Sequence, residues 1–139
     1  MIKELCKDEA ILSKRCERAT AQDAPVAQDL VDTMHSLEDC GCLAANQIGV
    51  TKAVVVFQDD SGADHVMYNP RIMMGLRAAK MVEGCMTREE PSKVTRYQKV
   101  KVSFDELVDG ELKPRRRDYT GFEAQMIQHM CDHCQGKLV

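Results

Sequence analysis

Hydrophobic residues recur at helical spacing in two stretches of the chain. Within residues 25–37 an apolar side chain appears at every third or fourth position, at Val26, Leu30, Val31, Met34 and Leu37. Pro25 suits the first turn of such a helix, where its missing N–H loses no hydrogen bond. A second amphipathic run begins at about residue 118 or 120 and continues to 134, and Gly136 is well placed to end it. The pattern therefore predicts one helix near each end of the chain.

β-Branched runs and alternating patterns predict strands between these helices. The predicted strands are residues 52–57, 65–68 and 94–104, together with 71–82, where a mixture of Met, Ala and Arg weakens the pattern. Turn-forming residues separate them, at 59–62, at Asn69-Pro70 and at 108–111. Strands in the middle and helices at both ends indicate an α+β fold in a single domain, residues 1–139. The charged first 20 residues are expected to form a peripheral arm.

Composition and charge disfavour several classes of protein. The chain has 139 residues, a net charge of −3 and 4% aromatic residues, which argues against a direct nucleic-acid site. No apolar run approaches the roughly 20 residues that a membrane-spanning helix needs. The start of the chain is charged throughout and lacks the apolar segment of a secretory signal. We therefore expect a cytoplasmic protein without a membrane partner. Arg115-Arg116-Arg117 follows a turn and is interpreted as a solvated loop.

Seven cysteines are many for this length, and their number is odd. Without an export signal, thiols that fill the core or bind metal are a better interpretation than a disulfide scaffold, because the cytosol is reducing. Cys40-x-Cys42 and the Cys131/Cys134 pair have spacings that also occur in separate metal or redox sites, and this alternative stays open.

Two histidines suggest a metal site in the second helix. His129 and His133 stand four residues apart and so share one helix face, beside an apolar stripe that includes Met126 and Met130. The same spacing also occurs in structural histidines, so the pair alone does not decide. Cys85, in Glu83-Gly84-Cys85-Met86, is a candidate third ligand. A Cys and two His leave the fourth tetrahedral position open, which is the layout of a catalytic metal site.

Three motifs in this order resemble those of the peptide deformylase family. They are Cys40-Gly41-Cys42-Leu43-Ala44-Ala45-Asn46-Gln47, Glu83-Gly84-Cys85-Met86-Thr87 and Gln128-His129-Met130-Cys131-Asp132-His133. Tyr68-Asn69-Pro70, between the first two, is also similar to the family. The resemblance covers about residues 22 to 136. It implies a fold of antiparallel sheets around a central helix that carries both histidines.

The resemblance also implies roles for individual residues. Cys85, His129 and His133 would hold one divalent metal, Fe(II) in this family, with Zn, Ni or Co able to replace it. Gln47 and the backbone N–H of Met86 would stabilise the developing oxyanion. The remaining residues expected at the substrate site are Gly41, Cys42, Glu83 and Met126. The implied substrate is the formylated N-terminal Met of a nascent peptide, and the ribosome is a further candidate partner.

The chain departs from the family pattern at three motif positions. Met130 occupies the place of the family's Glu, which takes a proton from the attacking water and delivers it to the leaving amine. Cys40 and Cys42 replace two glycines and could narrow the path of the substrate. Three hypotheses follow. The chain is a deformylase with weak or no activity, a catalytically inactive protein that binds peptide or metal, or a small sensor that uses its thiols.

Overall fold

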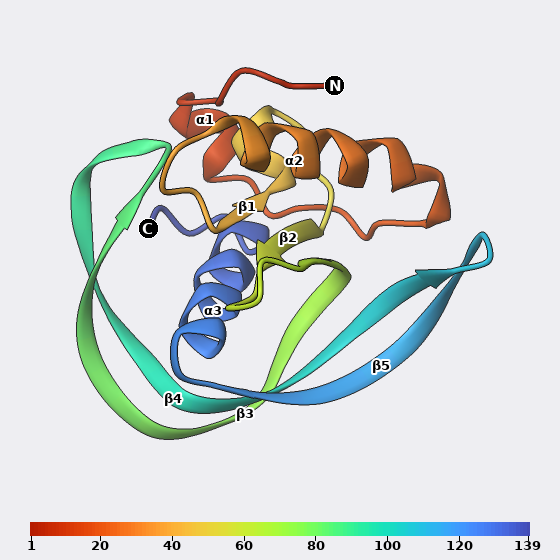
Figure 1. The fold of residues 1–139 in the computed structure, drawn as a ribbon. Coiled ribbons are helices and arrows are strands. Elements are labelled where there is room, and N and C mark those ends of the chain that lie inside the picture. Colours follow the sequence, from red (N-terminus) through yellow and green to blue (C-terminus); the bar gives the residue numbers. More distant parts are fainter.

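A five-stranded antiparallel sheet curves around one central helix in the computed structural model, which describes residues 1–139 (Figure 1). The strands follow the order β1-β2-β3-β4-β5. Their bounds are β1 Cys42–Ala44, β2 Val54–Gln58, β3 Asp64–Cys85, β4 Arg88–Val108 and β5 Glu111–Thr120. The helices are α1 Glu9–Leu12, α2 Ala24–Ser36 and α3 Gly121–Cys134, with short 3₁₀ turns η1 Ala21–Asp23 and η2 Ala45–Ile48. No helix is long and apolar enough to cross a bilayer.

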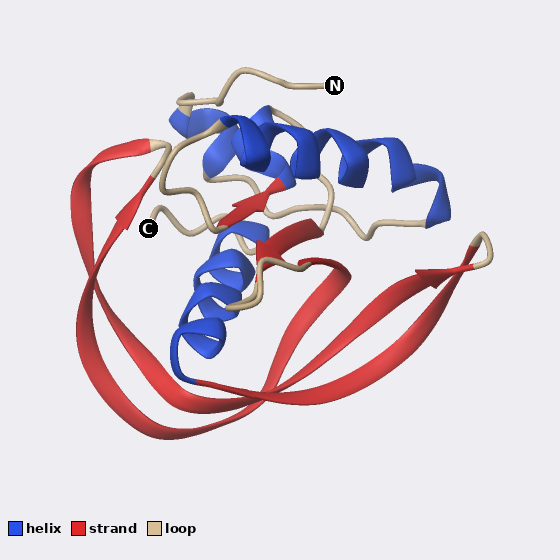
Figure 2. Ribbon diagram, viewed as in Figure 1, coloured by secondary structure: helices blue, strands red, loops and turns tan.

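Strand β2 separates two hydrophobic cores, because its two faces are both covered. Val54 and Val56 pack with α2, whereas Val55 and Phe57 pack with α3. All four side chains are at most 1% exposed, which explains why this strand is apolar at successive positions and does not alternate. Figure 2 shows α2 on one side of the short strands and α3 on the other. The α+β fold and the central position of the histidine-bearing helix are confirmed.

The two predicted helices and most predicted strands are present, with some changes of length. The helix predicted at 25–37 is α2, and the last predicted helix is α3. Helix α3 ends shortly before Gly136, which adopts a positive φ of 78°. The segments predicted at 65–68 and 71–82 are one strand, β3. Its pairing with β4 changes register between Tyr68 and Arg71, and Asn69 adopts a positive φ of 54° there. The turn at Asn69-Pro70 is therefore an irregularity within a strand and does not end it.

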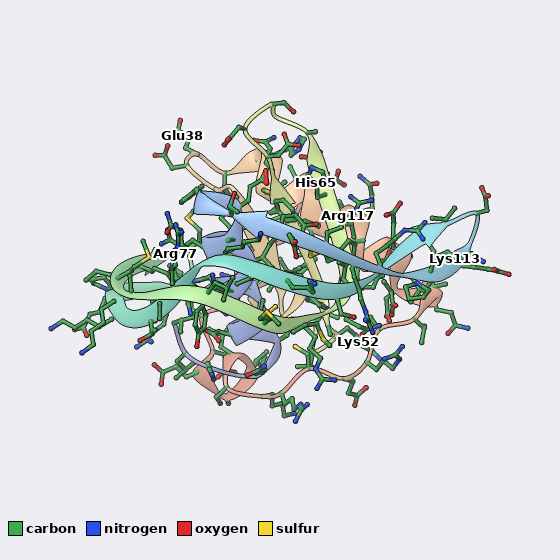
Figure 3. All side chains as sticks on the ribbon, turned by 90° about the horizontal axis from the view of Figure 1, so that it is seen from below. Glu38, Lys52, His65, Arg77, Lys113 and Arg117 are labelled. Carbon is green, nitrogen blue, oxygen red and sulfur yellow. The ribbon has the colours of Figure 1, made fainter.

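Strand β5 was not predicted, and the prediction of a loop at Arg115, Arg116 and Arg117 is wrong because all three lie in this strand. Asp109 and Gly110 have positive φ values of 51° and 80°, as in the two-residue turns that join antiparallel strands. The chain therefore turns back and pairs along β4. Arg117 lies over the Phe104 ring, 6.0 Å from its centroid, and both it and Lys113 are visible along this strand in Figure 3. Basic residues on an edge strand discourage pairing with another sheet.

The N-terminal segment is mostly exposed, but two of its side chains anchor it in the core. Leu12 and Ala19 are each 1% exposed. The backbone N–H of Cys16 donates to the carbonyl oxygen of Cys134 at 2.8 Å. A Cβ at Gly136 would lie 2.5 Å from the backbone oxygen of Ser13, so the two ends of the chain approach too closely for a side chain there. Leu12 ends a short apolar run with Ala10 and Ile11, and the many charged residues on both sides of this run hid its burial.

We expect Leu12→Ala to lower the free energy of unfolding by about 2–4 kcal/mol, because it removes a buried side chain and leaves a cavity. Ile2→Ala is the matched control, since Ile2 is 63% exposed, and it should change stability by less than about 0.5 kcal/mol. Urea denaturation of the three proteins measures both effects. Equal stabilities of Leu12→Ala and the wild type would show that Leu12 does not anchor the segment.

Candidate metal centre

The fold brings one thiol and two imidazoles together. Cys85 is the last residue of β3, and His129 and His133 stand one turn apart on α3. The donor atoms of the three side chains all lie within 4.8 Å of one another. The two histidine Nε2 atoms are 3.1 Å apart, and the Cys85 Sγ is 3.5 Å from the Nε2 of His133. Both histidines are buried, so these nitrogens face each other and the thiol, away from bulk water.

These separations fit a single metal ion. A tetrahedral ion with bonds of about 2.1 Å to nitrogen and about 2.3 Å to sulfur holds its ligand atoms about 3.4–3.6 Å apart. The observed distances are close to this range. One thiolate and two imidazoles are also donors that transition metals prefer to calcium or magnesium. The three residues predicted as metal ligands therefore lie together in one group.

A buried network orients the first histidine. The Nδ1 of His129 lies 2.8 Å from a carboxylate oxygen of Glu83, so its Nε2 is directed towards Cys85 and His133. Arg96 donates two hydrogen bonds to Glu83, at 2.8 and 3.0 Å. Burial raises the pKa of Glu83, but hydrogen bonds from His129 and Arg96 outweigh it and lower the pKa to about 2. Glu83 therefore stays ionised and positions the histidine.

Glu83 was expected at the substrate site, and it does line the cavity described below. Both of its oxygens, however, already accept hydrogen bonds, from Arg96, His129 and Gln125. Arg96 also binds Asp132 at 2.8 Å. Arg96 and Gln125 were not predicted as site residues, although both contact Glu83. Arg96 stands at an inward-facing position of the alternating pattern of β4, and a charged residue at such a position could have indicated a buried ion pair. The sequence alone does not show whether such a residue is buried or lies at an exposed edge.

The thiol and the first histidine influence each other's charge. Burial raises the pKa of Cys85, but hydrogen bonds from His129 and His133 outweigh burial and lower the pKa to about 5. Burial lowers the pKa of His129, whereas hydrogen bonds to Cys85 and Glu83 outweigh burial and raise it to about 9. Without metal, the site is therefore a thiolate and an imidazolium at neutral pH.

A cavity of about 610 Å³ opens beside this group. It is lined by every site residue named from the sequence except His133, namely Gly41, Cys42, Gln47, Glu83, Cys85, Met86, Met126, His129 and Met130. The first motif forms one wall, the end of β3 another, and α3 the third. A Cβ at Gly41 would already contact the Met126 sulfur at 3.4 Å, so the wall at this point is closely packed.

The amide of Gln47 is fixed beside the thiol. Its Oε1 accepts a hydrogen bond from the backbone N–H of Ala44 at 2.9 Å. Its Nε2 lies 3.3 Å from the Cys85 Sγ and 3.2 Å from the Thr87 hydroxyl. The side chain is 1% exposed, so its amide is held in place and donates to the Cys85 sulfur and the Thr87 hydroxyl. Thr87, the last residue of the second motif, was not assigned a role from the sequence.

The cavity wall has no buried carboxylate whose oxygens lack hydrogen-bond partners and could act beside the three candidate metal ligands. Met130, which follows His129, is 1% exposed and lines the cavity. The acidic residues on the cavity wall are Asp39 and Glu83. Asp39 is exposed, and the hydrogen bonds of Glu83 are described above. The arrangement can hold a metal and a bound molecule, but it presents no side chain suited to proton transfer at the position of Met130.

Comparisons with known proteins agree with this geometry. A family model described as polypeptide deformylase matches residues 2–139. The peptide deformylase of Clostridium beijerinckii is 35% identical over 140 residues, which cover 100% of both chains. That of Aquifex aeolicus is 36% identical over 135 residues, covering 91% of this chain and 78% of the relative.

Solved structures show the same fold. A peptide deformylase from Legionella pneumophila superposes with a TM-score of 0.84 at 30% identity, covering 99% of this chain and 83% of the other. A class I type b enzyme from Acinetobacter baumannii gives a TM-score of 0.85 at 24% identity, covering 99% and 97%. With the family model matched over residues 2–139, the chain belongs to the polypeptide deformylase family.

Proposed function

We propose that this protein binds one metal ion through Cys85, His129 and His133, takes a formylated peptide N-terminus into the adjoining cavity, and removes the formyl group slowly or not at all. Membership of the deformylase family supports the reaction type and the substrate class. The geometry of the three ligands supports the metal. The burial of Met130 beside them supports the loss of rate. Fe(II) is the expected metal, with Zn, Ni or Co as substitutes.

The metal's contribution would be Lewis acidity and a nucleophilic water at neutral pH. Cys85 and the histidines would hold it, and Glu83 would keep His129 in the required orientation. The amide of Gln47 would donate to the formyl oxygen as negative charge develops there, together with the backbone N–H of Met86. Donors already in position often provide the largest part of catalysis, because they need no reorganisation during the reaction.

One observation carries the proposed loss of activity: a thioether stands where the reaction needs a proton carrier. Met130 can neither take a proton from water nor give one to the leaving amine. A positioned general acid or base contributes roughly 10²–10⁴-fold to rate. Glu83 cannot replace it without breaking its bonds to Arg96 and His129, and Asp39 is exposed on the cavity wall.

The alternative function is a catalytically inactive protein that binds peptide or metal. It is favoured by the same combination of three assembled ligands, a cavity beside them and a missing acid/base. A thiol sensor is less favoured, because Cys131 and Cys134 belong to the hydrophobic core around α3. Whether the protein is a slow deformylase or an inactive binding protein, we propose that it works in the cytoplasm and binds new peptide chains, with the ribosome as a candidate partner.

Cys85→Ser should remove most of the bound metal, since a hydroxyl is a much weaker ligand than a thiolate for these ions. Metal analysis after loading and desalting measures the ratio of metal to protein. Cys6→Ser is the control, because Cys6 lies outside the ligand group. Full retention of metal by Cys85→Ser would refute the assignment of Cys85.

Metal affinity should increase with pH by about tenfold per unit between pH 6 and 8. In this range the Cys85 thiolate is already formed, since its pKa is about 5, and His129 must lose a proton to bind, since its pKa is about 9. Above the pKa of His129 the dependence should disappear. Competition with a chromophoric chelator at several pH values tests this, and an affinity that is constant from pH 6 to 8 would contradict it.

Met130→Glu should increase hydrolysis of a formyl-Met-Ala-Ser peptide by at least about 10²-fold at equal metal loading, because it restores an acid/base next to His129. Met130→Gln is the matched control, because a Gln side chain has nearly the same size as Glu and is also polar but cannot transfer the proton. A similar rate in both variants would mean that the cavity, in which Cys40 and Cys42 replace two glycines of the family, does not admit the substrate productively. The inactive binding protein would then be the better description.

A further inference from the structure

Two cysteines from opposite ends of the chain meet at the end of helix α3. The backbone N–H of Cys16 donates to the carbonyl oxygen of Cys134 at 2.8 Å. Close to this pair, Gly136 approaches the backbone of Ser13 so tightly that there is no room for a side chain. Both contacts hold the N-terminal segment against the end of the helix and place Cys16 opposite Cys134.

The thiols of these two residues also interact with each other. A hydrogen bond between them is the largest influence on both pKa values, since it lowers the pKa of Cys16 and raises the pKa of Cys134. Residues joined by backbone hydrogen bonding commonly have their Cα atoms about 5–6 Å apart, and a disulfide spans about 4.4–6.8 Å between Cα atoms. The two cysteines are therefore close enough for a disulfide bond, although both are free thiols in this structure.

We propose that Cys16 and Cys134 are a redox modification site, which forms a reversible disulfide in the presence of an excess of a low-molecular-weight disulfide such as oxidised glutathione. The bond would join the N-terminal segment covalently to the last residue of α3. Neither a metal nor a peptide takes part in this reaction, so the inference does not depend on the proposed function.

The reaction is thiol–disulfide exchange in two steps. Cys16 is half-buried, so a small disulfide can reach it, and its lowered pKa favours the reactive thiolate. This thiolate attacks one sulfur of oxidised glutathione, the S–S bond of that molecule breaks, and one glutathione leaves. The Cys134 sulfur then gives up its proton, attacks the Cys16 sulfur and releases the second glutathione. Two cysteine thiols are oxidised, and one glutathione disulfide is reduced to two thiols.

Cys131 is the alternative partner of Cys134, because the two residues stand three positions apart on α3. It is 4% exposed, and burial raises its pKa to about 12. Such a thiol is protonated at neutral pH and unreactive. Cys16 is the better partner, because it is partly accessible and already bonded to Cys134 through the backbone.

The disulfide would strengthen a junction between distant parts of the fold. Directly after Cys16, the backbone of Glu17 forms two hydrogen bonds of 2.9 Å with the segment before β2. Directly before Cys134 stands His133, one of the three candidate metal ligands. Oxidation would therefore tie the turn that carries this histidine to the segment beside β2. It would also restrict the unfolded chain, which raises the stability of the folded protein.

The test compares reduced protein with protein that has been incubated with an excess of oxidised glutathione and then desalted. Remaining thiols are alkylated, and peptide mapping by mass spectrometry identifies each disulfide. We expect a Cys16–Cys134 bond and a melting temperature at least about 5 °C above that of the reduced protein, because the bond closes a long loop. A thiol reductant should reverse both changes. The mapping separates this bond from any glutathione attached to Cys85, whose pKa is about 5.

Two variants from the N-terminal segment form a matched pair, because Cys6 and Cys16 are both half-buried thiols. Cys16→Ser should form no disulfide and should not gain stability on oxidation. Cys6→Ser should form the bond and show the same rise in melting temperature as the wild type. Peptide mapping of the wild type decides the pairing even if Cys16→Ser folds poorly.

Three outcomes would overturn the inference. The first is a wild type in which Cys16 stays free or remains bound to glutathione. The second is a disulfide between Cys134 and Cys131. The third is an equal rise in melting temperature in the wild type and in Cys16→Ser, since the rise would then not come from this bond. None of these outcomes affects the proposed metal site, which the Cys85→Ser experiment tests separately.

Discussion

Arg96 holds helix α3 in place, and the candidate metal site depends on that contact. Its guanidinium binds Glu83 on β3 and Asp132 on α3, and it is 6% exposed. Glu83 in turn bonds to His129, so one cation fixes a strand, a helix and a histidine together. Loss of one partner from such a buried set leaves an uncompensated charge, which costs about 3–5 kcal/mol. The geometry of the three donors is therefore maintained by charge pairing as well as by packing.

The same network limits what the site can do. Glu83 is the only buried carboxylate on the cavity wall. Its hydrogen bonds to Arg96 and His129 occupy its oxygens, so its role is to orient His129. Met130 packs in the core around α3 and also faces the cavity. A methionine at this position therefore satisfies the packing of the deformylase fold around α3.

The sequence was most informative where a feature is local. Helical spacing located α2 and α3, and two of the three motifs contain the cysteine and the two histidines that the fold brings into one group. Strand β5 was missed although Asp109-Gly110 is a strong hairpin signal, because the basic run after it was interpreted as loop. Leu12 and Arg96 could not be placed from sequence. Their burial depends on contacts with segments that are distant along the chain, and single-chain patterns carry no information about such contacts.

Helix α3 has a consequence for how the chain acquires its structure during synthesis. It contributes six of the thirteen residues in one of the two cores, and it follows every strand that it packs against. The long ribbon of β3, β4 and β5 thus leaves the ribosome before the helix that will cover it. Until that helix emerges, the inward face of the ribbon lacks its partner and remains open to association with other chains. Assembly of the cysteine–histidine group and burial of this face are therefore a single late event, and a chain that has these three side chains in place has also passed its most aggregation-prone stage.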